Sequence, residues 1–121
     1  MPNFSRDKTG INISILVIQV LLLIAQGKKS KVIDRVEALR TYVYTHLRKD
    51  ESFRSNCFIK MLLKMTEANF HKNGTIRKTE GLRKRLEEAS IGTKGYSNYV
   101  EIIPYEKLWE ISLGFLSNRA F

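Results

Sequence analysis

The residues of this chain that could act as a nucleophile or ligate a metal are one cysteine, Cys57, and two histidines, His46 and His71. A thiol beside an imidazole base is the arrangement of a cysteine nucleophile. Cys57, however, lies within an apolar helical pattern, where an unpaired cysteine usually packs as a small hydrophobic side chain. Neither histidine has another Cys or His at the spacing of a metal site. We therefore predict no enzyme activity, no catalytic or metal-binding residues and no cofactor.

Charged pairs in the second half of the chain are explained without chemistry. Glu87 and Glu88 are adjacent on a predicted helix, so they do not face each other as an acid and a base would. They follow Arg83 and Lys84 by four residues, which is the spacing of solvated ion pairs on a helix. His71 precedes Asn73 and Gly74 in sequence, and we expect it to be a cation at a helix end.

A basic cluster is the feature that competes most seriously with a purely structural interpretation. The chain has 121 residues and a formal charge of +9, so its surface is drawn to phosphates or to an acidic partner. Such a patch would bind nucleic acid in a salt-dependent way and largely without regard to sequence. The glutamates between the cations are explained by a solvated, charged helix face, and that interpretation is favoured over phosphate binding. The possible phosphate-binding residues are Lys28, Lys29, Lys31, Arg77, Lys78, Arg83, Lys84 and Arg85.

Four aromatic residues lie close together near the end of the sequence. Aromatic side chains with a polar tip often form the centre of a peptide-binding groove. They also seal the end of a hydrophobic core, which is the favoured interpretation here. The four are Tyr96, Tyr99, Tyr105 and Trp109.

The totals indicate one soluble globular domain. Hydrophobic residues make up 43% of the chain and charged residues 27%, which is enough apolar material for one core. The single cysteine excludes a disulfide within the chain, so a reducing compartment such as a bacterial cytoplasm is the expected location. No small-molecule substrate is indicated.

The apolar run from Ile13 to Ala25 determines the architecture. A membrane-spanning helix needs about 20 consecutive apolar residues, and this run is shorter and contains Ser14 and Gln19. A secretory signal remains as an alternative, although Asp7 in its charged start and Gln19 in its apolar middle count against it. The favoured interpretation is a buried helix that begins near Asn12 and ends at Gly27. Because it is apolar on nearly all sides, we expect it in the middle of a layer of helices.

Further helices follow at short intervals. Hydrophobic residues at steps of three and four predict an amphipathic helix from Ser30 to about Arg48, a third helix from Asp50 or Ser52 to about Asn73, and a fourth from Thr75. Pro104 suits the start of a last helix. The sequence therefore predicts an all-α single domain with an N-terminal extension over 1–11, two antiparallel helical hairpins over 12–90, a loop over 91–103 and a capping helix over 104–118.

Two stretches, "RVEALRTYVYTHLRKDESFRSNCFIKMLL" and "IPYEKLWE", give the chain a resemblance to tetratricopeptide-repeat-like (TPR-like) helical proteins. More narrowly, it resembles the C-terminal part of uncharacterised bacterial helical-repeat proteins. The usual repeat pattern of Trp, Leu-Gly, Tyr and small alanines is not present. The resemblance implies a short solenoid that serves as a scaffold for protein–protein interaction, which is the function we expect; a basic nucleic-acid-binding module is the alternative.

Self-association follows if the chain is one piece of a longer solenoid. Its first helix would then lack the preceding hairpin against which it would normally pack. The apolar face left exposed would favour association with another molecule. We expect a homodimer, or a monomer of low solubility, that uses Ile13, Val17 and Val20 as contact residues. No membrane association is expected.

Overall fold

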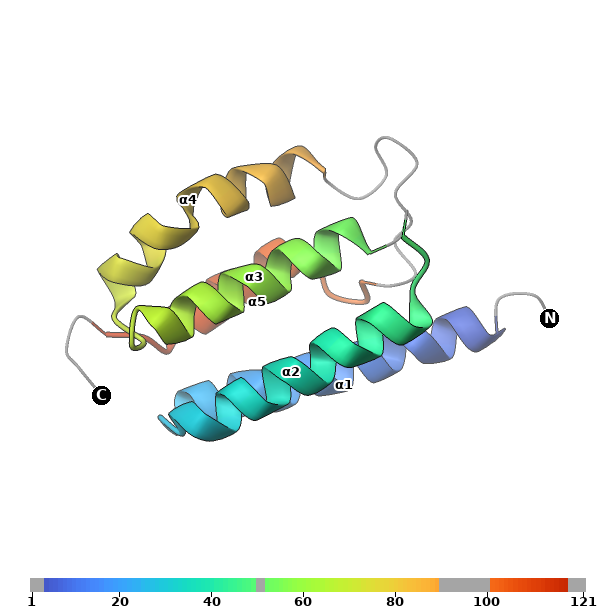
Figure 1. Cartoon of the computed structure of the whole chain (residues 1–121), viewed down its shortest axis with the longest axis horizontal. Coiled ribbons are helices and arrows are strands. Elements are labelled where there is room, and N and C mark those ends of the chain that lie inside the picture. The colour runs from blue at the N-terminus through green and yellow to red at the C-terminus, as the bar shows by residue number, and fades with distance from the viewer. Residues whose placement is uncertain (1–3, 50–51, 90–100, 118–121) are drawn as a thin grey trace.

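Five α-helices make up the described part of the chain, which in this computed structural model comprises residues 4–49, 52–89 and 101–117. These residues contain no strand, and only an isolated bridge pairs His71 with Ser117. The all-α prediction is confirmed. The helices are α1 (Phe4–Ala25), α2 (Lys29–His46), α3 (Phe53–Glu67), α4 (Lys72–Glu88) and α5 (Tyr105–Gly114) (Figure 1).

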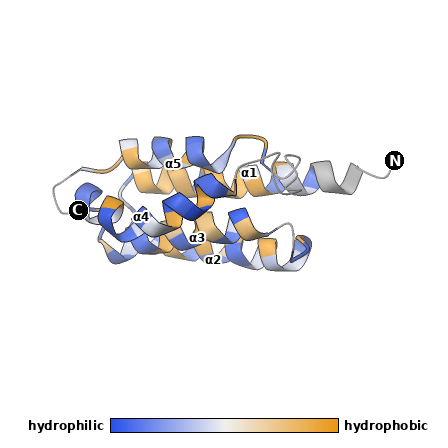
Figure 2. Ribbon diagram, turned by 90° about the horizontal axis from the view of Figure 1, so that it is seen from above, coloured by the Kyte–Doolittle hydropathy of each residue, from blue (hydrophilic) through white to orange (hydrophobic). Residues whose placement is uncertain are grey.

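Helix α3 is the centre of the arrangement. In Figure 1, α2 and α4 lie on either side of α3, and α1 lies behind α2. Helix α5 lies behind α3 and beside α1, as the view from above shows (Figure 2). Because α5 packs against α1, α3 and α4, it joins the α1–α2 pair to the α3–α4 pair from behind.

Helix α1 begins well before the predicted start at Asn12, so the described part of the expected N-terminal extension is helical. Asn12 does not cap the helix; its Nδ2 donates to the hydroxyl of Tyr42 on α2 at 2.9 Å. The predicted end at Gly27 is confirmed. Gly27 has a left-handed φ of 70°, and the Lys28 N–H donates to the carbonyl of Leu23 at 3.1 Å, as in a Schellman motif.

The position of α1 differs from the prediction. Among the described elements, α2 and α5 cover one side of the helix, and its opposite side carries exposed side chains. The helix therefore lies at the edge of the stack and not in the middle of a layer. Its buried residues are Ile13, Val17, Val20, Leu21 and Ile24.

The core of the second helix follows the predicted pattern. All the hydrophobic residues that recur at steps of three and four along α2 and its end are buried, which confirms that prediction. They face α1 on one side and α3 on the other. The five residues are Val32, Val36, Leu39, Val43 and Leu47.

The turn between α3 and α4 comes earlier than predicted. Asn69 and Phe70 both have left-handed backbones, with φ of 54° and 61°, and the N–H of Phe70 donates to the carbonyl of Met65 at 3.0 Å. The left-handed region is unfavourable for a bulky residue such as phenylalanine. The buried Phe70 side chain offsets that cost, because it is nearly inaccessible to solvent.

Helix α4 consequently starts at Lys72 and uses His71 as its N-cap. The ring Nδ1 of His71 accepts a hydrogen bond from the Gly74 N–H at 3.0 Å. His71 is therefore an acceptor at the start of α4, which corrects the expectation that it is a cation at a helix end. Thr75, the predicted start of this helix, lies within its first turn, and its side chain is completely buried.

The segment before α5 carries a buried carboxylate. The side chain of Glu101 is buried, whereas the side chain of the neighbouring Ile102 is 56% exposed. A carboxylate oxygen of Glu101 accepts the Tyr105 N–H at 2.9 Å and so satisfies a donor at the start of α5. Residues 90–100, which include Tyr96 and Tyr99, lie outside the described part, and the predictions for those two remain predictions.

Candidate interaction surfaces

A buried ion network joins α3, the end of α4 and the start of α5. Arg54 on α3 is 3% exposed, and its guanidinium donates to Glu101 at 2.7 and 3.0 Å and to Glu106. The same guanidinium donates to the carbonyls of Leu86 and Ala89, at 2.6 and 2.8 Å, in the last turn of α4. Those carbonyls have no partner within the helix, so the cation also stabilises the negative end of α4.

The charges of this network stabilise one another. Burial acts to lower the pKa of Arg54, but the hydrogen bonds and charges of Glu101 and Glu106 outweigh it and raise that pKa. Burial likewise acts to raise the pKa of Glu106, and the hydrogen bond and charge of Arg54 outweigh it and lower that pKa below its ordinary value. Since the guanidinium is enclosed and fully occupied, the network fixes α5 in place and offers no free group to a ligand.

Tyr105 and Trp109 are core residues, as the favoured interpretation of the four aromatic residues expects, and the peptide-groove alternative does not fit these two. Both are almost completely buried. The ring of Tyr105 stacks on Phe58 at 4.7 Å between centroids, and its hydroxyl shares a hydrogen bond with Ser55 Oγ at 2.6 Å. Trp109 meets Phe58 edge to face at 6.4 Å. Neither ring presents a face to a partner.

Cys57 and the two histidines lie apart. The thiol of Cys57 donates to the carbonyl of Leu82 at 3.1 Å, and burial raises its pKa although Lys60 and Arg85 act in the opposite direction. His46 stacks on Tyr42 at the exposed end of α2, and His71 caps α4. Among the described residues no three His, Cys, Asp or Glu side chains are grouped to hold a metal ion.

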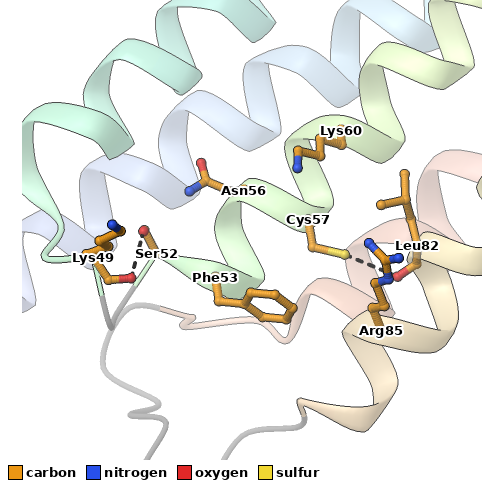
Figure 3. A pocket seen from close by; sticks show the side chains of 8 residues that line it. All are labelled: Lys49, Ser52, Phe53, Asn56, Cys57, Lys60, Leu82 and Arg85. Atoms are coloured by element: carbon orange, nitrogen blue, oxygen red, sulfur yellow. Dashed lines mark hydrogen bonds between the residues drawn. The ribbon is translucent and has the colours of Figure 1, made fainter.

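A groove runs along the outer side of α3, between the end of α2 and the second half of α4. Three adjoining hollows of about 290, 370 and 430 Å³ share Asn56, and we call their union the α3 groove. Figure 3 shows the first hollow, in which Lys60 and Arg85 lie on either side of Cys57. The whole groove is lined by Arg40, Tyr44, Leu47, Lys49, Ser52, Phe53, Asn56, Cys57, Ile59, Lys60, Leu63, Leu82 and Arg85.

The described lining of this groove is basic. Among residues 4–49, 52–89 and 101–117 it contains four cations, Arg40, Lys49, Lys60 and Arg85, and no carboxylate. By contrast, the hollow between α4 and α5 mixes Arg83 and Lys84 with Glu80 and Glu87. A concave surface lined by one sign of charge concentrates counter-ions, whereas a mixed surface largely neutralises itself. Sequence reasoning missed the groove because its cations come from three separate segments.

The predicted basic cluster is brought together only in part. Lys29 donates to Asn69 at 2.9 Å, so the α1–α2 junction, which also carries Lys28 and Lys31, lies near the turn that precedes α4. Arg77 and Lys78 lie at that same end, in the first half of α4.

The remaining cations of that cluster point in different directions from α4. Arg83 forms ion pairs with Glu87 and with Glu110 on α5. Lys84 is exposed, and Arg85 lines the α3 groove.

Helix α1 presents an apolar row to solvent, which we call the α1 stripe: Ile11, Ile15, Ile18 and Leu22. Each side chain is between 45% and 56% exposed, and steps of four, three and four align the residues on one side of the helix. Ile13, Val17 and Val20, which were expected to form the contact between copies, are at most 1% exposed because they pack into the chain's own core. The exposed apolar surface of α1 is therefore formed by the α1 stripe and not by the three residues that were predicted.

The segment from Lys8 to Ala25 is long enough and apolar enough, with a mean hydropathy of 2.0, to cross a membrane. Core helices of soluble proteins and signal sequences have the same properties. In the folded chain the inner side of this helix packs against α2 and α5. This property is therefore weak evidence for a membrane span.

Comparisons with protein-family models, with curated proteins and with solved structures give no match to this chain. Two exposed features of the described structure, the α1 stripe and the α3 groove, are therefore the basis for inferring what the chain does.

Proposed function

We propose that this chain is a non-enzymatic protein-interaction module of TPR-like architecture that associates with a second copy of itself through the α1 stripe. The observation that carries the proposal is the row of four large aliphatic side chains, each about half exposed, on one side of an edge helix. Isolated exposed apolar residues are ordinary on protein surfaces, but an aligned row of this kind marks an interaction site. The α1 helix of a second copy, packed antiparallel to the first, would contact this row with its own identical row.

The size of the stripe indicates a weak association. Complete burial of an Ile or Leu side chain is worth about 1.5–3 kcal/mol, so covering a half-exposed one contributes about 1 kcal/mol. Eight such side chains in a symmetric pair contribute on the order of 8 kcal/mol, which the loss of free motion, about 4–15 kcal/mol, largely offsets. We therefore expect a dimer that forms only at high protein concentration.

The antiparallel helix pairs α1–α2 and α3–α4, with α5 behind them, are the basis for proposing a short TPR-like stack. In this proposal α1 is the first helix of the stack, and its outer side is the surface on which a preceding hairpin of a longer solenoid would pack. The single buried thiol supports a reducing, cytoplasmic location for the module.

Concentration-dependent light scattering tests this function. The unmodified protein should shift from monomer toward dimer as its concentration rises, and the double variant Ile15→Glu/Ile18→Glu should remain monomeric. Ile76→Glu is the matched control, because Ile76 is 39% exposed on α4, away from the stripe. A monomer at all concentrations, or equal loss of dimer in the control, would contradict the proposal.

A vesicle-binding measurement distinguishes self-association from binding to a membrane surface. If the α1 stripe instead lies on a lipid surface, the protein should sediment with neutral phosphatidylcholine vesicles, and the double variant should not. In that result the stripe is an interaction surface for lipid, and the self-association proposal is abandoned.

The alternative function, a basic module that binds nucleic acid, remains a proposal in a changed form. In this alternative Arg85 remains a proposed phosphate contact, and the surface proposed for phosphate is the α3 groove, whose described lining is basic, and not the outer face of α4, where Arg83 is paired with Glu110.

A further inference from the structure

We propose that the α1 stripe and two exposed residues of α5, Ile111 and Phe115, form one continuous apolar face, and that a second copy of the chain binds this face with Phe115 of each copy against Ile11 of the other. This inference rests on the proposed self-association. It adds a second helix to the contact and the register in which the two copies meet.

Helix α5 exposes two large apolar side chains on one side, which we call the α5 row. Ile111 is 40% and Phe115 43% exposed, and the step of four residues aligns them along the helix. Glu110 is paired with Arg83 and therefore marks the side of α5 that faces α4. Ile111 and Phe115 are turned from Glu110 by about 100° and about 140° around the helix. They consequently lie on the flank away from α4, which is the flank beside α1 (Figure 2).

The α1 stripe has a polar edge toward α2 and an open edge toward α5. Asn12 donates to Tyr42 and so marks the side of α1 that faces α2. Gln19 and Gln26 follow Asn12 at steps of seven residues and continue this polar edge. The opposite edge of the stripe lies on the side where α1 packs against α5. The stripe and the α5 row therefore form one apolar surface, which we call the α1–α5 face.

The charge of the chain favours a second copy over an anionic partner on this face. The formal charge of the chain is +9, yet the stretch from Thr9 to Gly27 contains no charged residue. Two copies of a strongly cationic protein repel each other least where neither carries a charge. Lys8 and Lys107 adjoin the face at its edge, where their long side chains keep the ammonium groups in solvent. An acidic protein or an anionic lipid headgroup would bind better where lysine and arginine line the surface.

The α5 row also brings the contact nearer to the size that a specific pair needs. Stable protein–protein interfaces bury about 800 Å² on each partner. One row of four half-exposed side chains is narrow for such an area, and the α5 row widens the contact to two helices. Aromatic residues such as Phe115 are enriched in interfaces of this kind.

The positions of the helix ends determine the register. Lys29 donates to Asn69, so the end of α1 lies beside the turn between α3 and α4. The Lys72 N–H donates to the carbonyl of Ser117 at 2.8 Å, which places the end of α5 at that same end of the molecule. Helices α1 and α5 therefore run in the same direction, and Phe115 lies level with the last turns of α1 (Figure 1).

This register brings Phe115 to the far end of the partner's stripe. In an antiparallel pair of α1 helices, Leu22 of one copy faces Ile11 of the other. Phe115, which is level with Leu22 in its own copy, consequently reaches Ile11 of the second copy. Within one copy Ile11 and Leu22 are roughly 16 Å apart along α1, at about 1.5 Å per residue, so Phe115 does not meet the Ile11 of its own chain.

Concentration-dependent light scattering tests the contribution of α5. The double variant Ile111→Ser/Phe115→Ser should dimerise at least about tenfold more weakly than the unmodified protein, because two partly exposed side chains per copy lose their burial. Ile33→Ser/Ile76→Ser is the matched control. These two residues are 37% and 39% exposed on α2 and α4, outside the α1–α5 face. The control should change the dimer by less than about twofold.

The outcomes separate this inference from the function on which it rests. If Ile15→Glu/Ile18→Glu abolishes the dimer and Ile111→Ser/Phe115→Ser leaves it unchanged, the inference is overturned and the self-association of the α1 stripe stands. A protein that is monomeric at all concentrations overturns both. A monomer that binds phosphatidylcholine vesicles through the α1–α5 face would make the occupant a lipid surface and would also overturn both.

Disulfide cross-linking tests the register. The double variant Ile11→Cys/Phe115→Cys, in a Cys57→Ser background, should form a covalent dimer on mild oxidation with diamide. The hydroxyl introduced at position 57 can donate to the Leu82 carbonyl as the thiol does. A disulfide within one copy is excluded by the distance along α1, because the two Cα atoms of a disulfide lie within about 7 Å of each other.

Each single cysteine variant, in the same background, is a control. The antiparallel register keeps Ile11 of one copy away from Ile11 of the other, and Phe115 away from Phe115, so neither single variant should form a covalent dimer. Equal yields in the single and double variants would show random collision between molecules. No covalent dimer in the double variant, at concentrations where light scattering shows association, would place α5 outside the contact. Either result would overturn the inference.

Discussion

At the scale of single residues, Arg54 has the most consequential environment in the described structure. Its guanidinium is enclosed by two carboxylates and by two carbonyls at the end of α4, and it is the cation that compensates both buried carboxylates. A buried charge is costly unless its partners are complete, and removing one member leaves the others uncompensated.

Arg54→Met should therefore lower the free energy of unfolding by about 3–5 kcal/mol, as is typical when one partner of a buried ion pair is removed. Urea unfolding followed by circular dichroism measures the change. Arg83→Met is the matched control, because Arg83 pairs with Glu87 and Glu110 at a more exposed position and should cost at most about 1 kcal/mol. Similar losses of unfolding free energy in the two variants would show that the buried network stabilises the fold no more than the exposed ion pairs of Arg83 do.

The lowered pKa of Glu106 gives the protein a defined response to acid. A carboxylate whose folded pKa lies below its unfolded value, about 4.3, contributes stability that is complete above that value and is lost as the pH falls through the folded pKa. Urea midpoints should therefore fall as the pH is lowered below about 4.3. Glu106→Gln should be less stable near pH 7, by about 1 kcal/mol, and should lose less stability over the acid range. Parallel pH profiles in the two proteins would contradict this assignment.

Some of these residues carried a signal in the sequence. Arg54 occupies the apolar row of α3, four residues before the buried Phe58, and a cation in such a row implies a buried anion. The identity of that anion was not predictable, because Glu101 lies 47 residues further along the chain and follows no periodic pattern. The turn at Phe70 was not predicted for a different reason, since a left-handed phenylalanine violates the local backbone preference on which sequence-based prediction depends.

At the scale of elements, periodicity predicted what each helix buries toward its immediate neighbour. Helix α2 is the clearest case, because Val32, Val36, Leu39 and Val43 recur at steps of three and four and all four are buried. Helix α1 was placed wrongly because its residues are apolar on both sides, and periodicity cannot distinguish a covered side from an exposed one in such a helix. The α3 groove had no local signal, since it exists only when α2, α3 and α4 are packed together.

The start of α4 depends on the acceptor at His71. His71→Ala removes the acceptor for the Gly74 N–H and should cost about 1 kcal/mol of stability, whereas His71→Asn replaces one capping acceptor with another and should cost less. Thermal unfolding of the two variants at neutral pH measures the difference. Equal melting temperatures would show that the cap contributes nothing to α4.

At the scale of the whole molecule, the net charge of +9 acts on the two proposed associations with opposite signs. Two copies of the chain repel each other, and added salt screens that repulsion. A nucleotide strand is attracted, and added salt weakens its binding.

Raising sodium chloride from low to physiological concentration and above should therefore strengthen the dimer measured by light scattering and weaken oligonucleotide binding measured by anisotropy. Sodium glutamate in place of chloride controls for effects of the particular anion. If both associations changed in the same direction, one of the two surfaces would be assigned wrongly.

The path of the ion network through the chain also bears on how the protein is made. Ribosomes release Arg54 long before Glu101 and Glu106, which follow it by 47 and 52 residues. Until those carboxylates emerge, the nascent chain holds a guanidinium that α3 and α4 can bury only at a cost. The first two helices can pair while synthesis continues, but the later ones must wait for α5 before they close. Translation speed over the codons between Arg54 and Glu106 thus sets how long this part of the nascent chain remains a substrate for chaperones.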